Sequence, residues 1–390
     1  MSPAAPSSPA TAPALQMRAC VLRRPGCLEV ESVTLAPPRA GEVRVRIAAA
    51  GVCHSDLHLV DGQIGDGRWP AVPGHEGAGV VEAIGEGVEH LAIGDHVVLT
   101  LVAPCGSCPA CRTGHRTLCE VADARSTAGM MADGSSRLTA QDGTALQHGF
   151  TVACFAEHVV LGADSVIPIP HDVPLWQAAL LGCGVLTGFG AVSRAARVRI
   201  GESVCVIGCG GVGLQVIAAA RLAGAAVLVA VDRRADKLQA ALGHGATHAV
   251  DASRPDAVAE IVRLTGGGAE HAFEVVGSAA TIRLAWDVLH PGGTAVVVGY
   301  APRGVEVALP ATEFLSEKAI RGSYFGSADP AEALPELVEL VRSGRLNLAG
   351  VVSDVIELEG VPAALDRLRR GEGHRSVVIL DAELAGHQAP

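Results

Sequence analysis

The sequence predicts an α/β protein with two domains, one built on a doubly wound parallel sheet and one rich in β-strands and barrel-like. A chain of 390 residues is too long for one ordinary core. Between residues 18 and 160 the sequence consists of short alternating strands that Gly and Pro interrupt, whereas beyond residue 176 strands alternate with Ala-rich helical stretches. The first pattern indicates a barrel, and the second indicates βαβ units with a parallel sheet.

The predicted elements place the two domains along the chain. Strands are expected at 42–48, 78–84 and 96–101 in the β-rich part. A helix is expected at 330–343 and a closing strand at 376–380. The regular alternation of strands and helices has ended by this point, so we expect both ends of the chain to contribute to the β-rich domain. We therefore expect a disordered tail at 1–16, the β-rich domain at 17–184 and 326–390, and the parallel-sheet domain at 185–325.

Composition disfavours several classes of protein. The formal net charge is −11, whereas a general nucleic-acid binder needs clustered basic residues. No apolar stretch looks long and uninterrupted enough to span a bilayer, and residues 1–15 lack the basic start and apolar core of a signal peptide. Eleven cysteines in such a chain favour metal or thiol chemistry in a reducing cytoplasm over disulfides.

A glycine-rich loop follows a predicted strand at 203–207 and precedes a predicted helix at 212–223. Gly208, Gly210 and Gly213 form the pattern GxGxxG. The first glycine permits a tight turn, the second lets the backbone approach a pyrophosphate, and the third lets helix and strand pack closely. The alternative is a flexible turn in a chain with 47 glycines, but the strand before the loop and the helix after it favour a dinucleotide site.

The strand predicted at 226–231 leads to an acidic residue, Asp232, which lies nineteen residues beyond Gly213. A carboxylate there accepts hydrogen bonds from the adenosine ribose and repels a 2′-phosphate, so the sequence favours NAD over NADP. Arg233 and Arg234 would offset part of that repulsion, unless they are simply exposed residues at the start of a helix.

Four cysteines lie close together with the spacing C-x2-C-x2-C-x7-C: Cys105, Cys108, Cys111 and Cys119. Four thiolates in a loop that contains Gly and Pro suit a closed tetrahedral zinc site, and the alternatives are chance clustering or a disulfide pair. A filled site has no open coordination position, so this cluster predicts a structural metal. Cys53, His75 and Cys183 are joined by no local spacing, and each one alone has an ordinary interpretation as a buried core residue.

Together these segments resemble the zinc-containing alcohol dehydrogenases of the medium-chain dehydrogenase/reductase family, from about residue 18 to residue 380. The resemblance implies a Rossmann-type coenzyme domain and a GroES-like catalytic domain, with the structural zinc lobe at 104–120. MMADGSSRL leading to FAEHVV is similar to the longer, class I and class III type. The other segments that carry the resemblance are GVCHSD (51–56), GHEGAGVVEAIGEGV (74–88), GCGVLTGFGA (182–191), GCGGVG (208–213), VD (231–232) and FEVVGS (273–278).

The resemblance implies a second, catalytic zinc whose ligands are Cys53, His75 and Cys183, with the fourth position open to water or substrate. Glu76 would lie behind the metal, and Asp56 would orient His75. His54 and Arg375 would contact the coenzyme pyrophosphate. The full predicted coenzyme site is His54, Thr187, Gly208, Gly210, Gly211, Val212, Gly213, Asp232, Arg233, Lys237, Val276, Val298 and Arg375.

The implied reaction is hydride transfer between a primary alcohol and NAD, because bound zinc lowers the pKa of the alcohol hydroxyl. Ser55 would receive the released proton and His58 would pass it to solvent, unless His58 is an ordinary surface histidine. Leu101 stands where relatives commonly carry an aromatic residue, which predicts a wider pocket, and Phe155 and Tyr300 are expected to narrow it or to stack on a substrate ring. These residues favour a medium-chain, allylic or aromatic alcohol.

The sequence departs from the glutathione-dependent formaldehyde dehydrogenases at two positions. They carry an Arg four residues beyond the last structural cysteine, where this chain has Asp123, an acid that would repel a carboxylate. They also tend to carry Tyr where this chain has His58. Thiol-adduct formaldehyde oxidation is therefore the alternative function, and Arg125 is close enough in sequence to keep it open.

Two further classes compete with this interpretation: a zinc-free reductase of the same superfamily and a non-enzymatic zinc-ribbon module. The metal residues disfavour the first, and the acidic charge together with the nucleotide-binding half disfavours the second. We expect two zinc ions per chain, NAD, a small alcohol or aldehyde as substrate, and no nucleic-acid or membrane partner. A homodimer (or homotetramer) is expected through sheet extension by strands at 294–298 and 305–309.

Overall fold

The computed structural model describes residues 12–64, 67 and 69–386. Its N-terminal part forms a small closed barrel in which short strands pair around an apolar interior. β1 begins at Leu15, so Leu15 and Gln16 belong to the barrel and not to the expected tail, whose residues 1–11 lie outside the described residues. The barrel strands are, in order, β1 (Leu15–Arg24), β2 (Cys27–Leu35), β7 (Leu138–Ala140), β8 (Ala145–His148) and β4 (Ala71–Val72).

A seven-stranded sheet lies against this barrel and joins the two ends of the chain. β18 runs antiparallel to β3, with Ser376 opposite Val52. This pairing brings the residues around 375 to the end of β3, where the catalytic segment begins. The strands are β10 (Val166–Ile169), β6 (His96–Leu99), β5 (Glu76–Ile84), β3 (Glu42–Val52), β18 (Arg375–Ile379) and β17 (Val352–Ile356), with β9 (His158–Gly162) also paired to β3.

The coenzyme domain is a six-stranded parallel sheet in the order β13-β12-β11-β14-β15-β16. This is the 3-2-1-4-5-6 order of a dinucleotide-binding fold, with the crevice where the order reverses beside β11. The strands are β11 (Ser203–Ile207), β12 (Val227–Asp232), β13 (His248–Asp251), β14 (Ala269–Glu274), β15 (Leu289–Val297) and β16 (Ala319–Gly322). The helices that flank them are α6 (Gly211–Leu222), α7 (Ala235–Gly243), α8 (Ala257–Leu264) and α9 (Ala279–Asp287).

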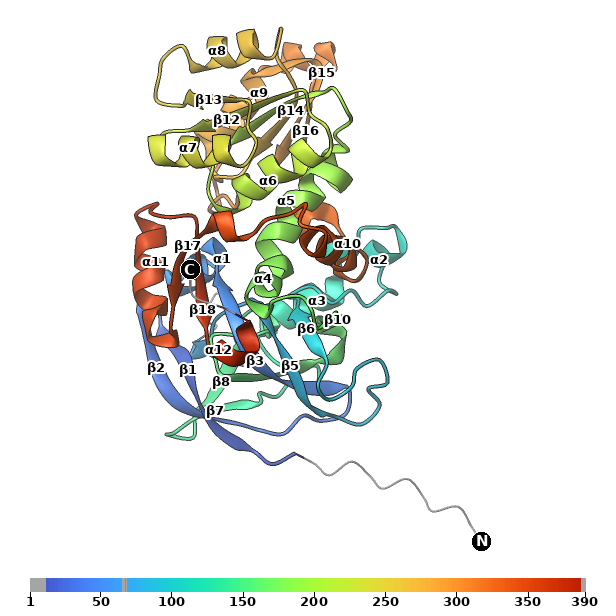
Figure 1. The fold of residues 1–390 in the computed structure, drawn as a ribbon, viewed down its shortest axis with the longest axis vertical. Helices are drawn as coiled ribbons and strands as arrows, with labels where there is room; N and C mark the ends of the chain where they lie inside the picture. Colours follow the sequence, from blue (N-terminus) through green and yellow to red (C-terminus); the bar gives the residue numbers. More distant parts are fainter. Residues whose placement is uncertain (1–11, 65–66, 68, 387–390) are drawn as a thin grey trace.

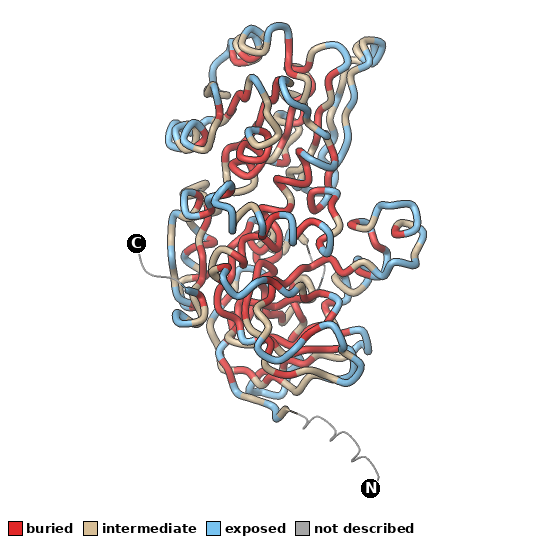
Figure 2. Tube along the Cα trace, turned by 45° about the vertical axis from the view of Figure 1, so that its right-hand side comes forward, coloured by how far each residue is buried: buried red, intermediate tan, exposed pale blue. Residues whose placement is uncertain are grey.

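One continuous helical segment, Leu175–Ala196, connects the domains, and it includes α4 (Leu175–Leu180) and α5 (Leu186–Gly190). By length and composition alone this segment could cross a membrane, so the expectation that no such stretch exists is wrong. However, 72% of its apolar window is buried inside the protein. α4 packs on β3 and β5, and α5 packs on α6, as expected of a core helix. Figure 2 shows buried segments running through both domains.

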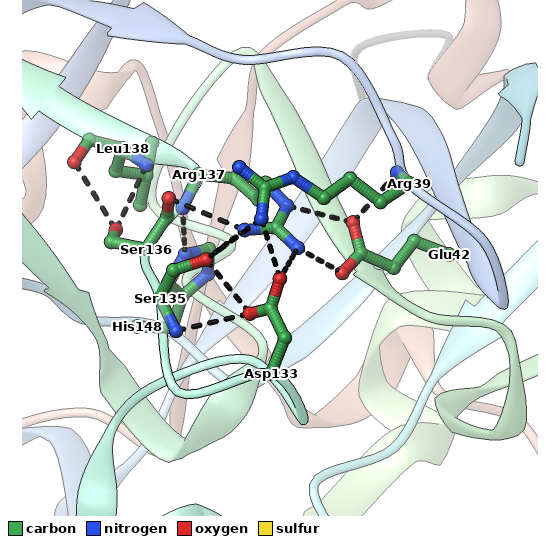
Figure 3. A network of polar contacts seen from close by, with 8 residues as sticks. All are labelled: Arg39, Glu42, Asp133, Ser135, Ser136, Arg137, Leu138 and His148. Carbon is green, nitrogen blue, oxygen red and sulfur yellow. Dashed lines mark hydrogen bonds and ion pairs between the residues drawn. The ribbon is translucent and has the colours of Figure 1, made fainter.

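A buried ion-pair network ties the barrel to the sheet (Figure 3). Arg137 is 1% exposed and forms hydrogen bonds with both carboxylate oxygens of Glu42, at 2.8 and 2.5 Å. Its guanidinium also lies 2.8 Å from Asp133, and its backbone N–H donates to Nε2 of His148 at 3.2 Å. A buried charge needs such partners, because an unpaired one costs several kcal/mol.

The structure differs from two further sequence expectations. No strand forms at 305–309, and β15 is not at the edge of its sheet because β16 pairs with it. The predicted helix at 330–343 is α10 (Pro330–Arg342). All eleven cysteines are free thiols.

Candidate active site and metal centres

Three segments that are remote in sequence bring the predicted catalytic ligands together. Cys53 caps α1 (His54–Val60) at the end of β3, His75 precedes β5, and Cys183 lies in the linking helix. The ligand atoms of Cys53, His75, Glu76 and Cys183 all lie within 4.8 Å of one another. Because all four side chains are buried, this cluster is built to hold a charged group away from water.

His75 provides the test of whether a metal fits this cluster. Its Nδ1 lies 3.0 Å from Oδ1 of Asp56, so the carboxylate fixes the ring orientation and makes Nδ1 the protonated nitrogen. Its Nε2 is buried and has no hydrogen-bond partner. A buried nitrogen without a partner is unfavourable unless an ion fills the space, so Nε2 and the two thiols fit zinc.

Asp56 holds more than the imidazole. Its two oxygens also accept hydrogen bonds from the backbone N–H groups of Cys53 (3.2 Å) and Gly74 (3.1 Å). The carboxylate is fully buried, so it links the backbones of two ligand-bearing segments and positions both.

Behind the cluster, Glu76 forms an ion pair with Arg375 at 3.0 Å, and the backbone N–H of Gly184 donates to Glu76 at 3.2 Å. Burial raises the pKa of Glu76 to about 7, and the charge of Arg375 opposes that rise. A side chain at position 51 would collide with Glu76, since a Cβ there would lie 2.2 Å from its carboxylate. The Arg375 guanidinium is also adjacent to Gly211 at the start of α6, between the metal cluster and the coenzyme loop.

The four clustered cysteines form the second metal centre. Their sulfur atoms lie within 4.8 Å of one another. Backbone N–H groups of Ser107 and Cys108 donate to Cys105 Sγ, and these bonds lower the pKa of that thiol to about 6. Cys119 Sγ accepts from the N–H groups of Cys105 and Ala122. Four sulfur ligands, together with hydrogen bonds that favour the thiolate form, suit a closed tetrahedral zinc site.

A cleft of about 1980 Å³ runs between the two domains. Cys183 and Thr187 are four residues apart and both line it, so one helix carries a predicted metal ligand and a predicted coenzyme-binding residue. Cys53 lines the same cleft. The other predicted residues on its wall are His54, Ser55, His58, Leu101, Gly208, Gly210, Gly211, Val212, Gly213, Asp232, Arg233, Lys237, Val276, Val298 and Tyr300.

The glycine loop has the geometry that its sequence predicts. Gly208 has φ +96°, and a Cβ on Gly213 would lie 1.9 Å from the carbonyl oxygen of Gly208. Gly210 has open space beside it, with no atom within 4 Å of an added Cβ. The loop therefore combines a turn that needs glycine, a close helix–strand contact and room for a pyrophosphate at the start of α6.

Asp232 lies at the end of β12 and accepts hydrogen bonds from the N–H groups of Cys209 (2.9 Å) and Arg234 (3.0 Å). Arg234 is engaged by Asp236 at 2.9 Å. The carboxylate is thus fixed at the cleft, in the position from which an adenosine ribose is bound.

The predicted proton route begins beside the metal ligands. Ser55 Oγ lies 4.0 Å from Cys53 Sγ. His58 Nδ1 lies 2.6 Å from Gln63 Oε1, and the ring centroids of His58 and Tyr300 are 5.1 Å apart. Both Ser55 and His58 line the cleft.

The prediction for Phe155 is wrong. Its side chain is fully buried against Gly74 in the core and does not line the cleft. Phe150 lines it instead, with its ring centroid 4.7 Å from that of His75, and so does Phe325. Phe150 has φ +53°, and this left-handed turn decides which phenylalanine faces the site. No sequence signal marks that turn, because positive φ is expected at Gly and, less often, at Asn, Asp or His, and not at Phe.

Comparisons with known proteins agree with this architecture. Residues 39–171 match the alcohol dehydrogenase GroES-like domain, and residues 211–343 match the zinc-binding dehydrogenase family. The chain is 37% identical over 354 residues to S-(hydroxymethyl)glutathione dehydrogenase of Synechocystis sp., covering 90% of this chain and 96% of the relative. It is 36% identical over 361 residues to alcohol dehydrogenase class-3 of Cereibacter sphaeroides, with the same coverage.

Two solved structures are similar over nearly the whole chain. An alcohol dehydrogenase zinc-binding domain protein from Burkholderia ambifaria has a TM-score of 0.90 and 36% identity, and benzyl alcohol dehydrogenase from Acinetobacter calcoaceticus has 0.88 and 32%. Each match covers 94% of this chain and 99% of the other. The predicted fold, enzyme class and cofactors, zinc and NAD, are confirmed. This chain belongs to the zinc-containing alcohol dehydrogenases of the medium-chain dehydrogenase/reductase family.

Proposed function

We propose that the substrate of this alcohol dehydrogenase carries a terminal hydroxymethyl group, which gives a hydride to NAD and a proton to solvent. A free primary alcohol then becomes an aldehyde, and a thiol adduct of formaldehyde becomes an S-formyl thioester. One observation carries the proposal: Cys53 and Cys183, which belong to the buried metal-ligand cluster, also line the cleft that contains the glycine loop and Asp232. A hydroxyl group bound at this cluster therefore lies in the same cavity as the coenzyme.

The residues around the cluster supply positioning and proton transfer. When bound, zinc supplies a Lewis acid that lowers the pKa of the substrate hydroxyl. Asp56 holds His75 and the backbones of two ligand segments, while the phenyl ring of Phe150 covers His75. We assign Ser55 as the first proton acceptor and His58 as the residue that releases the proton to solvent; their places on the cleft wall support both roles.

The first candidate substrate is a thiol adduct of formaldehyde. Four curated relatives at 35–37% identity, from Synechocystis, Paracoccus denitrificans, Schizosaccharomyces pombe and Photobacterium damsela, bear the name S-(hydroxymethyl)glutathione dehydrogenase or its probable form. These comparisons favour the thiol adduct over a free alcohol, which was the main expectation from the sequence.

The second candidate is a free aromatic, allylic or medium-chain primary alcohol. Asp123 lines the cleft and would repel a carboxylate-bearing thiol such as glutathione, while Arg125 is bound to Asp164 at 2.7 Å and does not line this cleft. Phe150 and Phe325 offer rings against which an aromatic substrate can pack. The similar benzyl alcohol dehydrogenase structure supports the same candidate.

A substrate panel separates the two candidates. NADH formation by the zinc-loaded enzyme is measured with formaldehyde alone, formaldehyde plus glutathione, benzyl alcohol, hexanol and ethanol. A rate that requires both formaldehyde and thiol supports the thiol adduct, and a higher kcat/KM for benzyl alcohol or hexanol than for ethanol supports the free alcohol. If none of these substrates reduces NAD, the proposed function is wrong.

We propose a homodimer that forms through the outer edge of the coenzyme sheet. β16 is the last strand of that sheet, and Val305, Phe314 and Leu315 are exposed in the segment that leads to it. Leu315 is 89% exposed, and three exposed large apolar side chains in one short segment support an interface at this edge. A solution mass of twice the chain mass is expected, and a monomer at micromolar concentration would contradict the dimer.

We also propose a reducing, cytoplasmic setting, which six predicted zinc-ligand thiols and five other free cysteines support.

A further inference from the structure

The outer end of the cleft is formed by one face of α3 (Glu120–Ala128) and by the segments opposite to it. Asp123, Ser126 and Thr127, spaced i, i+3 and i+4, all line the cleft. Residues at this spacing share one helix face. Leu118 and Tyr324 lie on the same cleft wall and are both more than half exposed.

Asp123 gives this end of the cleft its charge. Among the described cleft-lining residues between 101 and 150, it is the only Asp, Glu, Lys or Arg. Its carboxylate forms no hydrogen bond or ion pair with any described residue. The neighbouring cations are occupied elsewhere: Arg116 pairs with Asp329, and Arg125 pairs with Asp164 beside a second cavity. The basic residues of the cleft come from the coenzyme domain and residues 368–371.

Tyr324 lies beside this acidic end of the cleft. It directly precedes the turn Phe325–Ser327, which contacts the turn Arg116–Leu118 just before α3. Tyr324, Asp123 and the metal ligand Cys183 all line the same cleft. An aromatic ring near a carboxylate that no described side chain neutralises is a combination that binds organic cations, because the ring face and the anion both attract positive charge.

We propose that Asp123 and Tyr324 form a subsite for a cationic group at the far end of the substrate, so that the preferred substrates are hydroxymethyl compounds with a distal amine. The inference rests on the proposed function and names the substrate class for the same site. It applies equally to a free alcohol and to a thiol adduct, because only the tail reaches Asp123. A substrate with a carboxylate tail is disfavoured at this position.

A purely structural role for Asp123 makes a different prediction. An acid in the first turn of a helix is favoured by the helix dipole wherever its side chain points. Glu120 occupies the same first turn and does not line the cleft. Glu120→Gln therefore removes the same charge from the same turn and serves as the matched control for Asp123→Asn.

The test compares kcat/KM, with NAD and the zinc-loaded enzyme, for 4-(aminomethyl)benzyl alcohol, 4-methylbenzyl alcohol and 4-(hydroxymethyl)benzoate. Formaldehyde adducts of cysteamine and of 3-mercaptopropionate provide the thiol arm. For the native chain the cationic member of each arm is preferred to the anionic one by roughly fivefold or more, the scale of one partly screened ion pair. The difference lies in KM, because the tail contact is the same in ground and transition states.

The variants decide the assignment. Asp123→Asn removes most of the preference and Asp123→Arg reverses it, whereas Glu120→Gln leaves it unchanged. A preference that survives in Asp123→Asn, or that falls equally in Glu120→Gln, overturns the subsite while leaving the dehydrogenase function intact. Failure of every substrate in both arms overturns the proposed function and the subsite together. Thermal unfolding of each variant confirms that the fold is retained.

Discussion

At the scale of single residues, the site contains a buried nitrogen without a partner and a phenylalanine with a strained backbone. Nε2 of His75 is buried without a partner, which metal ligation would satisfy. Phe150 adopts φ +53°, a conformation that costs an L-residue about 1 kcal/mol. Its ring covers His75 as a result. Backbone strain of this kind commonly accompanies functional sites.

Two substitutions at Phe150 distinguish the effect of its backbone conformation on stability from the effect of its ring on substrate preference. Phe150→Gly and Phe150→Ala both remove the ring, but only glycine relieves the left-handed backbone. We expect the Gly variant to be more stable than the Ala variant by about 1 kcal/mol in denaturant unfolding. Both variants should raise kcat/KM for bulky alcohols relative to ethanol, because the cleft widens. Equal stabilities would show that the turn carries no strain.

At the scale of elements, the Arg137 network couples the loop before β7 to β3 and β8 (Figure 3). His148 ends β8, and its Nε2 accepts the Arg137 N–H. Burial lowers the pKa of His148 to about 4, and the charge of Arg137 acts in the same direction. The ring is therefore neutral in the folded protein over a range of pH in which an unfolded chain protonates it.

Acidification should therefore destabilise the fold through His148. Between about pH 6.5, the pKa of an unperturbed histidine, and pH 4 the unfolded chain binds the extra proton, so stability is full above that window and is lost as pH falls through it. The loss approaches about 3 kcal/mol. His148→Gln, which keeps an acceptor for Arg137 and cannot titrate, should flatten the stability curve between pH 7 and 5 in denaturant unfolding. His115→Gln at an exposed site should not, and an unchanged curve for His148→Gln would exclude this histidine as a source.

At the scale of the whole molecule, the sequence predicted the sites whose residues lie close together in one short segment. The glycine loop, Asp232 and the four-cysteine lobe are each contained in a short segment, so spacing alone indicated their chemistry. Cys53, His75 and Cys183 could be assembled only through family resemblance, because pairing of β3, β5 and the linking helix sets their distances. The Phe150 turn and the edge position of β16 escaped prediction, since a backbone reversal and a strand order decide them.

If the two predicted zinc ions have different roles, one closed in the four-cysteine lobe and one facing the coenzyme cleft, removing one ligand of the second should abolish turnover and leave the first in place. The direct measurement is zinc content together with NAD reduction in Cys53→Ser and in the native chain. We expect two zinc ions per native chain, and one per Cys53→Ser chain with turnover abolished and the fold retained. A Cys53→Ser enzyme that keeps two zinc ions and oxidises alcohol at the native rate would contradict the account.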